Sequence, residues 1–367
     1  MNNQIKNKEN IRVVQLIDSL EPGGAERMAV TLANSLVSKV ELSCLIVTRQ
    51  EGGLKKSVNS AVKYCFLNKK KTFDFKAIIK FKNFIKLNKI KIIHAHGSSY
   101  FFAVLLKLVY PNVKIIWHDH FGNRANEQGI NFLIPCFSIF FSGVFSVNEE
   151  LKLWAMKNLF TANIAFIPNF CELKINETKT TYLKGDIEKR IVCLANLKSP
   201  KNHFFLLKSF ALSELPKLGW TLHFIGKDFN DDYSKVLKNF IFENELNNAV
   251  YLYGSCLDTN HILSQARYGV LASTYEGFPV TLLEYGMSNL VVLSTNVGYC
   301  SKIITSDKTG FLFDTKDPNS LRVLFNSLPN SDLQNKIIGD NFNTFVKENY
   351  TADIILRQLI GYYQKWI

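Results

Sequence analysis

The sequence predicts an α/β protein made of two doubly wound, Rossmann-like domains that face a central cleft. Short β-branched runs alternate with amphipathic segments of helix length along most of the 367 residues, a pattern typical of parallel strands joined by crossover helices. A chain of this length is about twice what one hydrophobic core organises. The alternation lapses once, in the polar stretch 169–189, so one domain is expected on either side of it.

The first domain is expected over residues 1–170, where short apolar runs predict strands and segments of helical period predict helices. The predicted strands are Arg12–Ile17, Leu42–Val47, Val62–Phe66, Ile90–Ala95, Val113–Trp117, Val144–Val147 and Ile164–Ile167. The predicted helices are Ala25–Val37, Phe75–Leu87, Tyr100–Val109 and Glu149–Lys157. Because ligands of doubly wound sheets bind beyond the carboxyl ends of the strands, functional residues are expected just after the strands.

A linker is expected over 171–189 and the second domain over 190–350. The predicted strands of this domain, each followed by a helical segment, are Ile191–Ala195, Thr221–Ile225, Ala249–Leu252, Gly269–Ala272, Val291–Ser294 and Gly310–Phe313. The aromatic-rich segment 351–367 is expected to form a helix that packs back on the first domain.

The basic residues are concentrated in the first half of the chain. Residues 1–180 carry 25 basic and 13 acidic side chains, whereas residues 181–367 carry 19 and 18. The first domain is therefore expected to lie near negative charge. The overall composition, 47% apolar and 20% charged, excludes intrinsic disorder, collagen and coiled coil.

The cysteines and the apolar segments indicate the cellular compartment in which the protein is expected. Seven scattered cysteines without metal-ligand spacing indicate reduced core residues in a reducing compartment. The polar first ten residues lack the apolar segment of a secretory signal, so we expect a cytoplasmic protein. The uncharged segment Gly129–Val147 is long enough to raise a membrane span as an alternative. Pro135, Gly143 and three serines divide it into shorter pieces, which favours burial.

The first predicted strand leads into the segment PGGAER at residues 22–27. Paired glycines, Gly23 and Gly24, at a strand-to-helix junction let the backbone approach a ligand with no Cβ in the way. An ordinary turn is the alternative. The segment is not a dinucleotide fingerprint, because the third glycine of the GxGxxG spacing and an acidic residue at the end of the second strand are both missing.

The segment STYEGFPVTLLEYG at residues 273–286 follows a predicted strand and opens a predicted helix. Gly277 makes the turn flexible, and Pro279 stands where the first turn of a helix accepts proline. The backbone amides after Phe278 can then receive a phosphate, which the helix dipole favours.

Two acidic residues, Glu276 and Glu284, flank this anion site. Carboxylates suit hydroxyl groups better than phosphate, so the arrangement fits a sugar on one side of a diphosphate and a ribose on the other. A solvated pair of glutamates is the alternative. Leucine and tyrosine neighbours of Glu284 weaken it, because an unsatisfied carboxylate among apolar side chains is unfavourable.

The spacing of Glu276 and Glu284 within EGFPVTLLE closely resembles the donor-site motif of the retaining GT-B glycosyltransferases of glycosyltransferase family 4. Further similarities follow in family order along the chain. They are PGGAER at 22–27, IIHAH at 92–96, SVNEEL at 146–151 and IPN at 167–169. The resemblance implies a nucleotide-sugar donor held by the second domain, an acceptor held by the first, and transfer in the cleft with retention at the anomeric carbon.

The resemblance also implies roles for single residues. Glu276 would bind hydroxyls of the donor sugar and Glu284 those of the ribose. The amides of Gly277, Phe278 and Pro279 would receive phosphate, and Gly23 and Gly24 would lie at the donor.

Members of the family carry a basic pair after the first strand of the second domain, in a pattern like GRLxxxKG. Here the segment reads ANLKSPKN at 195–202. Lys201 matches the family lysine, whereas Asn196 stands where arginine is usual. Lys198 can replace that arginine, because a phosphate needs positive charge more than one geometry. Catalysis would then be mainly stabilisation of the leaving group, with no metal and no cofactor besides the nucleoside-diphosphate sugar.

Histidines follow the predicted strand Val113–Trp117, where the family presents a cleft histidine near the reacting centre. His120 matches that position best and His118 second. An ordinary core or surface histidine is the alternative for both. The triplet His118-Asp119-His120 makes a poor metal site, since nothing else in the sequence supplies the remaining ligands.

A lysine-rich stretch, Lys55–Lys91, contains twelve lysines and one acidic residue with aromatic and aliphatic residues interleaved. No nucleic-acid-binding motif accompanies it, so nucleic acid is not expected as a partner. A basic amphipathic helix at an anionic membrane surface fits the pattern, and a solvated helix face is the alternative.

Together these features predict transfer of a sugar from a UDP- or GDP-sugar to a hydroxyl of a growing glycan, most simply a polyprenyl-pyrophosphate-linked glycan, in capsule, O-antigen or exopolysaccharide assembly. The enzyme would act at the inner face of the cell membrane. A sugar-nucleotide 2-epimerase of the same fold and a non-catalytic, two-lobed sugar-binding protein are the alternatives. The first needs further acid and base groups in the second domain, and the second normally carries a secretory signal.

Overall fold

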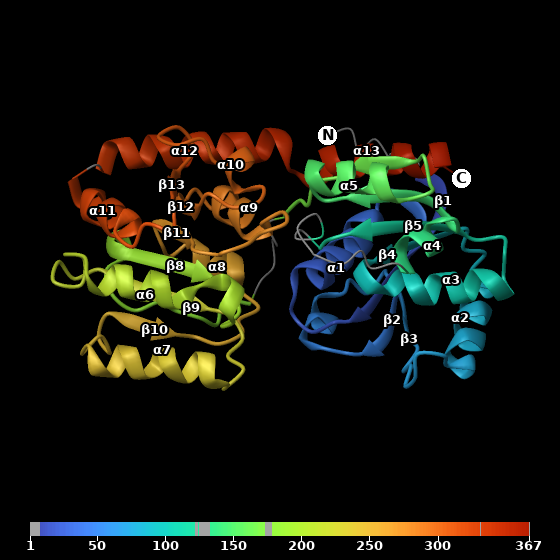
Figure 1. Ribbon diagram of the computed structural model, residues 1–367, viewed down its shortest axis with the longest axis horizontal. Coiled ribbons are helices and arrows are strands. Elements are labelled where there is room, and N and C mark those ends of the chain that lie inside the picture. The colour runs from blue at the N-terminus through green and yellow to red at the C-terminus, as the bar shows by residue number, and fades with distance from the viewer. Residues whose placement is uncertain (1–7, 122–123, 125–132, 173–177, 331, 367) are drawn as a thin grey trace. The chain divides into compact units, whose positions relative to one another are not determined.

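The computed structural model describes residues 8–121, 124, 133–172, 178–330 and 332–366. They fall into two compact units, Met1–Phe170 with Ala352–Ile367 and Cys171–Thr351. Each unit is built on one parallel sheet with helices packed on it (Figure 1). The two doubly wound α/β domains expected from the sequence are therefore confirmed.

In the first unit, the described residues form a seven-stranded parallel sheet in the order β3-β2-β1-β4-β5-β6-β7. Its strands are β1 (Glu9–Ser19), β2 (Val40–Gln50), β3 (Lys63–Phe66), β4 (Ile92–His96), β5 (Lys114–Asp119), β6 (Phe141–Ser146) and β7 (Ile164–Phe166). Its helices are α1 (Gly24–Leu36), α2 (Phe75–Leu87), α3 (Tyr100–Val109), α4 (Leu133–Ser138), α5 (Glu149–Asn158) and α13 (Ala352–Trp366).

Helices cover both faces of this sheet. Because successive side chains of a strand point to opposite faces, neighbouring residues of β1 pack against different helices. On β1, Val14 and Leu16 lie in the apolar core that α2 and α3 complete. There Phe81 and Phe102 stack with ring centroids 5.8 Å apart. Gln15 is buried between Val14 and Leu16 in sequence and so faces the opposite side, on which it reaches α13.

Helix α13 belongs to the first unit although it follows the whole of the second unit in sequence. Trp366 stacks on Phe145 of β6 with ring centroids 5.1 Å apart, and a Cβ added to Gly143 would meet the Trp366 ring at 2.1 Å. The buried Tyr363 places its hydroxyl 2.6 Å from Nδ1 of His94 on β4. The aromatic residues of this segment thus form its contact with the sheet.

In the second unit, the described residues form a six-stranded parallel sheet in the order β10-β9-β8-β11-β12-β13. Its strands are β8 (Arg190–Leu194), β9 (Thr221–Ile225), β10 (Val250–Leu252), β11 (Tyr268–Leu271), β12 (Val291–Thr295) and β13 (Phe311–Phe313). Its helices are α6 (His203–Ala211), α7 (Asp232–Glu243), α8 (Thr259–Leu263), α9 (Val280–Met287), α10 (Cys300–Ile303), α11 (Ser320–Ser327) and α12 (Asp332–Asn349).

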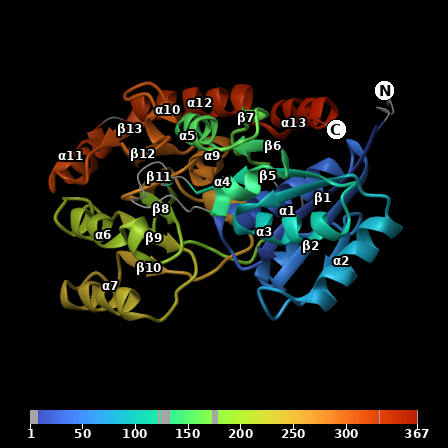
Figure 2. The same cartoon turned by 45° about the vertical axis from the view of Figure 1, so that its right-hand side comes forward.

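Helices also cover both faces of the second sheet. Tyr268 and Val270 of β11 lie in the core that includes α6, α7 and α11, and α6 lies beside β8 and β9 in both views (Figures 1 and 2). Gly269, between those two residues, faces the ring of Tyr285 on α9, which a Cβ would meet at 2.6 Å. Helix α12 packs on α9 and β12.

Part of the segment expected to be a linker, 171–189, is bonded to the second unit; residues 173–177 lie outside the described residues. The carboxylate of Asp258 accepts hydrogen bonds from the backbone N–H of Thr180 at 2.8 Å and of Thr181 at 2.7 Å. Burial raises the pKa of this carboxyl, but these hydrogen bonds outweigh it and bring the pKa down to about 2. The polar residues of this segment therefore make local contacts in addition to connecting the sheets.

The apolar segment Gly129–Val147 is described from residue 133 onward, where it forms α4 and β6. Ile134 and Phe141 within it are buried in the core of the first unit. Among the described residues, no helix combines the length and the apolar character that a membrane crossing requires.

Candidate active site

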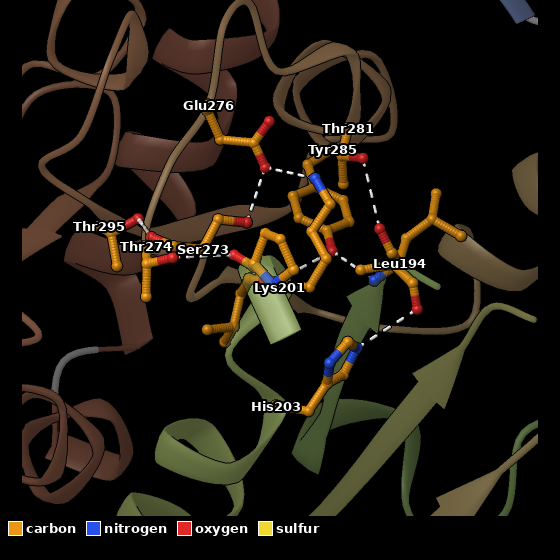
Figure 3. A network of polar contacts seen from close by, with 12 residues as sticks. Leu194, Lys201, His203, Ser273, Thr274, Glu276, Thr281, Tyr285 and Thr295 are labelled. Carbon is orange, nitrogen blue, oxygen red and sulfur yellow. Dashed lines mark hydrogen bonds and ion pairs between the residues drawn. The ribbon is translucent and has the colours of Figure 1, made fainter. Parts of the chain in front are cut away.

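The loop between β11 and α9 carries Glu276 and is tied to two neighbouring strand ends (Figure 3). The backbone N–H of Thr274 donates to the carbonyl of Pro200 at 2.9 Å, and the Thr295 hydroxyl donates to the carbonyl of Ser273 at 2.9 Å. Because Pro200 follows β8 and Thr295 ends β12, these bonds hold the loop at the carboxyl edge of the sheet. This is the edge at which doubly wound sheets bind ligands.

Lys201 and Glu276 form the central ion pair of this edge. Nζ of Lys201 lies 2.5 Å from Oε1 of Glu276, and the Ser273 hydroxyl donates to the same oxygen at 2.6 Å. The Glu276 side chain is 10% exposed and that of Lys201 is 24% exposed. Both contacts use Oε1, and no hydrogen bond to Oε2 is found among the described residues. A nearly buried carboxylate is thus neutralised on one oxygen and keeps the other for a hydroxyl donor.

Gly298, just after β12, holds the backbone of Glu276 in place. Its φ is +52°, and a Cβ at this position would lie 1.7 Å from the Glu276 carbonyl oxygen. Any other residue would therefore displace the loop that carries the carboxylate. Gly298 and the hydroxyl of Ser273 were not predicted from the sequence. A glycine after a strand end was the signal for Gly298, but only the fold shows which loop it touches.

Helix α9 begins at Val280, directly after Pro279. The Leu282 N–H donates to the Pro279 carbonyl, and helix geometry leaves the N–H groups of Val280 and Thr281 without intrahelical acceptors. Pro279 itself has no N–H, so the expectation that its amide receives a phosphate is wrong. The first turn of α9 keeps two donors suited to an anion.

The other residues of the predicted donor motif lie around this turn. The Phe278 side chain is buried and stacks on Tyr299 with ring centroids 5.1 Å apart, so the ring packs within the second unit. Glu284 is half-buried in the second turn of α9. Burial, and then the nearby Glu284 carboxylate, raise the pKa of the Cys171 thiol.

Tyr285 anchors α9 to the strand that leads to Lys201. The backbone N–H of Leu194, at the end of β8, donates to the Tyr285 hydroxyl at 2.8 Å. The Thr281 hydroxyl donates to the Leu194 carbonyl at 3.3 Å. These bonds couple the start of α9 to the segment that follows β8.

Lys201, Asn196 and Lys198, the three residues of the segment after β8 that were predicted to contact phosphate, have different surroundings in the structure. Lys201 reaches Glu276, as described above. Asn196 accepts a hydrogen bond on Oδ1 from the Lys227 N–H at 2.9 Å, which binds it to the segment after β9. Lys198 is exposed, and no ion pair of Lys198 is found in the part of the chain that the structure describes.

Gly23 and Gly24 belong to the first unit. Gly23 is the N-cap of α1, where a Cβ would meet only the flexible carboxylate of Glu26 at 2.2 Å, while a Cβ at Gly24 would meet open space. Packing within this unit therefore leaves room for a side chain at Gly24.

His118 and His120 of the first unit belong to a cluster with two histidines of β4, His94 and His96, in which His120 is half-buried and the other three are buried. Nε2 of His94 lies 3.1 Å from Nδ1 of His118, and Nδ1 of His96 lies 2.9 Å from Nε2 of His120. Burial lowers the pKa of all four rings: to about 3 for His120, and well below the ordinary range for the other three, where neighbouring rings add to the effect. The four imidazoles are therefore uncharged at neutral pH.

Three of these rings, His94, His96 and His118, place nitrogen atoms within 4.8 Å of one another, which raises the question of a metal ion. The rings of His94 and His96 stack with centroids 4.5 Å apart and an interplanar angle of 12°. Nitrogen lone pairs lie in the ring plane, so two nearly parallel rings cannot both point at one ion. The arrangement therefore does not fit a three-histidine metal centre.

Asp119, the last residue of β5, lies between His118 and His120 in sequence and is buried and paired with Arg124. The guanidinium donates to both carboxylate oxygens, at 2.6 and 3.1 Å, and lies over Trp117 and Trp154 at 5.3 and 5.5 Å from their ring centres. The carboxylate in the triplet His118-Asp119-His120 is therefore already bound by Arg124 through both of its oxygens.

Two protein-family models together match most of the chain. The model described as Glycosyltransferase Family 4 matches residues 22–173, and the model described as Glycosyl transferases group 1 matches residues 174–345. The two models thus divide the chain near the boundary between the two units.

Individual relatives are distant but similar over long stretches. The capsular polysaccharide biosynthesis glycosyltransferase CapH of Staphylococcus aureus is 22% identical over 80% of this chain and 83% of its own. The UDP-Gal:alpha-D-GlcNAc-diphosphoundecaprenol alpha-1,3-galactosyltransferase of Escherichia coli is 20% identical over 96% of this chain and 98% of its own. Among solved structures, HepE of Anabaena in complex with UDP and glucose is 15% identical, with a TM-score of 0.82 over 97% of this chain and all of that chain.

Proposed function

Because this chain belongs to the GT-B glycosyltransferases, with family models covering 22–345, we propose that it transfers a sugar from a nucleoside-diphosphate sugar to a hydroxyl of a growing glycan, with retention at the anomeric carbon. The contacts of Glu276 with Lys201 and with Ser273 carry this proposal. A cation and a carboxylate oxygen, side by side at the carboxyl edge of the sheet, match a diphosphate bonded to a sugar.

In this mechanism the second unit stabilises the departing diphosphate. The bond between the anomeric carbon and the phosphate oxygen breaks, and the electron pair leaves with the nucleoside diphosphate. Lys201 and the first-turn N–H groups of α9 face the negative charge that develops on that oxygen. The acceptor hydroxyl bonds to the anomeric carbon on the side that the leaving group vacates, and its proton passes to the departing phosphate.

Glu276 orients the donor sugar through Oε2, while Oε1 remains bonded to Lys201 and Ser273. Lys198 supplies additional positive charge once a diphosphate is present. Glu284 binds the ribose hydroxyls. His120 contacts the donor sugar, and His118 is the alternative for that contact. No metal takes part, because lysine and helix N–H groups supply the positive charge.

The relatives suggest the acceptor. One is described as a galactosyltransferase acting on GlcNAc-diphosphoundecaprenol and another as a capsular polysaccharide enzyme. We therefore assign the acceptor to the polyprenyl-pyrophosphate-linked glycans of bacterial surface polysaccharides, and the site of action to the inner face of the cell membrane.

The exposed face of α2 supports contact with an anionic membrane. Phe75 is 76% exposed and Ile79 is 58% exposed, and the lysines 76, 80 and 86 are exposed on the same helix. A merely solvated face would carry the lysines without the large apolar side chains. Lysines near a membrane surface contribute about 1 kcal/mol each.

Vesicle binding tests this contact. The protein should sediment with phosphatidylglycerol vesicles and not with phosphatidylcholine vesicles, and the double variant Phe75→Ser, Ile79→Ser should bind more weakly. Phe242→Ser is the matched control, because Phe242 is 75% exposed on α7 of the second unit. Equal binding of the double variant and the control would refute the contact.

Donor chemistry tests the central assignment. Incubation with UDP- and GDP-sugars should release nucleoside diphosphate only when a glycan acceptor is added, whereas an altered sugar without acceptor would indicate an epimerase. Glu276→Gln should lower kcat by about 100-fold with little change in melting temperature. Glu243→Gln, at an exposed position on α7, is the control. Full activity of Glu276→Gln would refute the role of this carboxylate.

A further inference from the structure

The four histidines of the first unit form two parallel rows that meet at Gln15. One row runs from Gln15 through His96 to His120, and Oε1 of Gln15 lies 2.8 Å from Nε2 of His96. The other runs from Gln15 through the Tyr363 hydroxyl to His94 and then to His118. The rings of His94 and His96, one from each row, stack on each other.

With the Gln15 side-chain amide oriented as in the structure, the first row has one consistent placement of protons. The carbonyl oxygen of Gln15 can only accept, so Nε2 of His96 carries the proton and donates it. A neutral His96 then has a lone pair on Nδ1, so Nε2 of His120 must be the donor in the 2.9 Å contact between them. His120 is neutral as well, which leaves the lone pair on its Nδ1.

The protons of the second row are set by the NH₂ group of the Gln15 amide. Nε2 of Gln15 donates to the Tyr363 hydroxyl at 3.5 Å, and the Tyr363 hydroxyl donates to Nδ1 of His94 at 2.6 Å. Nε2 of His94 therefore donates to Nδ1 of His118 at 3.1 Å. His118 is left with its proton on the buried Nε2.

We propose that Gln15 and His96 are positioning residues that hold His120 in the tautomer with the proton on Nε2 and the lone pair on Nδ1. Turning the Gln15 amide over would reverse every proton in both rows, so a single amide sets the state of all four rings. The consequence for catalysis rests on the proposed function, in which His120 contacts the donor sugar. In the proposed state, His120 accepts a hydrogen bond from a sugar hydroxyl and has no proton to give on that side.

The tautomer can be measured in the free protein. Protein labelled with ¹⁵N-histidine, in NMR spectra that correlate ring nitrogens with ring carbon-bound protons, distinguishes protonated from unprotonated Nδ1 and Nε2. The signals of His120 are assigned by their loss in His120→Asn. We expect a single tautomer of His120, protonated on Nε2. A proton on Nδ1 in the unaltered protein would overturn the proposal whatever the behaviour of any variant.

Two variants separate the rows. Gln15→Met keeps the approximate volume but removes the amide, so His96 loses its fixed acceptor and the His120 signals should divide between tautomers. If about half of the molecules then hold the competent tautomer, the apparent affinity for the donor falls about twofold, and kcat/KM falls about twofold with it. Tyr363→Phe removes only the hydroxyl of the second row, so the tautomer of His120 and kcat/KM should not change.

The outcomes separate this proposal from the proposed function. An unchanged single tautomer in a folded Gln15→Met would refute the positioning role, even if the protein is an active transferase. The expected tautomers in a protein that releases no nucleotide would instead refute the proposed function and leave the proton arrangement standing. Melting temperatures of both variants confirm that each is folded.

Discussion

Lowering the pH from about 7.5 to about 5.5 should destabilise the first unit more than the second, because buried neutral histidines are concentrated there. In the first unit, burial holds the pKa of His94, His96 and His118 well below the usual range and that of His120 at about 3. The second unit has a smaller set. It consists of His203, with a pKa of about 4, and His223, with a pKa of about 3, both lowered by burial.

The sign follows from proton binding. Unfolded histidines bind protons below pH about 6.5, while the folded rings remain neutral until the pH approaches their lowered pKa. Their stabilising contribution is therefore complete above that pH and is lost as the pH falls. At about pH 5.5 each such histidine lowers the free energy of unfolding by about 1.4 kcal/mol, which amounts to about 6 kcal/mol in the first unit and about 3 kcal/mol in the second. The first figure is comparable to the whole stability of many domains, about 5–15 kcal/mol.

Hydrogen exchange followed by mass spectrometry resolves the two units in one experiment. After correction for the intrinsic exchange rate at each pH, the strands β1, β4 and β5 should lose more protection than β8, β9 and β11. The pH interval lies above the range in which carboxyl groups titrate, about pH 4, so the second unit serves as the internal control. Equal losses in both units, or stability that does not depend on pH, would refute the reasoning.

Replacing Gly298 with alanine should lower kcat by up to about 100-fold, because the new Cβ displaces the backbone of Glu276; kinetics with saturating donor would show this, and unchanged kcat would contradict the close approach. Gly143→Ala should destabilise the first unit by about 1–3 kcal/mol by pressing on Trp366, as measured by urea unfolding, and a neutral effect would show that α13 is not held there. Prolonged EDTA treatment should leave kcat unchanged, because Lys201 supplies the charge that a metal would provide; a loss that Mg²⁺ restores would refute this.

The central strands of both sheets could be predicted from the sequence because strands such as β4, β9, β11 and β12 are short apolar runs that are buried on both faces. Ile191–Ala195 and Thr221–Ile225 needed no tertiary information, and the structure places β8 and β9 there. The polar segment 171–189 was harder to interpret. The backbone N–H groups of its threonines donate to Asp258. Because Asp258 lies far along the chain, no pattern within the segment itself predicts this contact.

The candidate site was predictable only where its residues lie within one motif. The segment around Glu276 and the lysine at 201 stand out in the sequence, but their contact depends on loops that follow two different strands. The role of Gln15 could not be predicted from the sequence, because a single glutamine in an apolar strand does not show which side chains it hydrogen-bonds. Proton directions emerge only when donors and acceptors from β1, β4, β5 and α13 are considered together.

The place of α13 in the first unit has a consequence for biosynthesis. A ribosome makes the strands β1 to β7 early, but the helix that covers Gln15 and the histidines emerges only after residues 171–351 have been made. Until then a nascent first unit exposes the apolar and histidine-bearing face of its sheet to chaperones and to other chains. The second unit, which is continuous in sequence, can complete its own folding before the older one is finished.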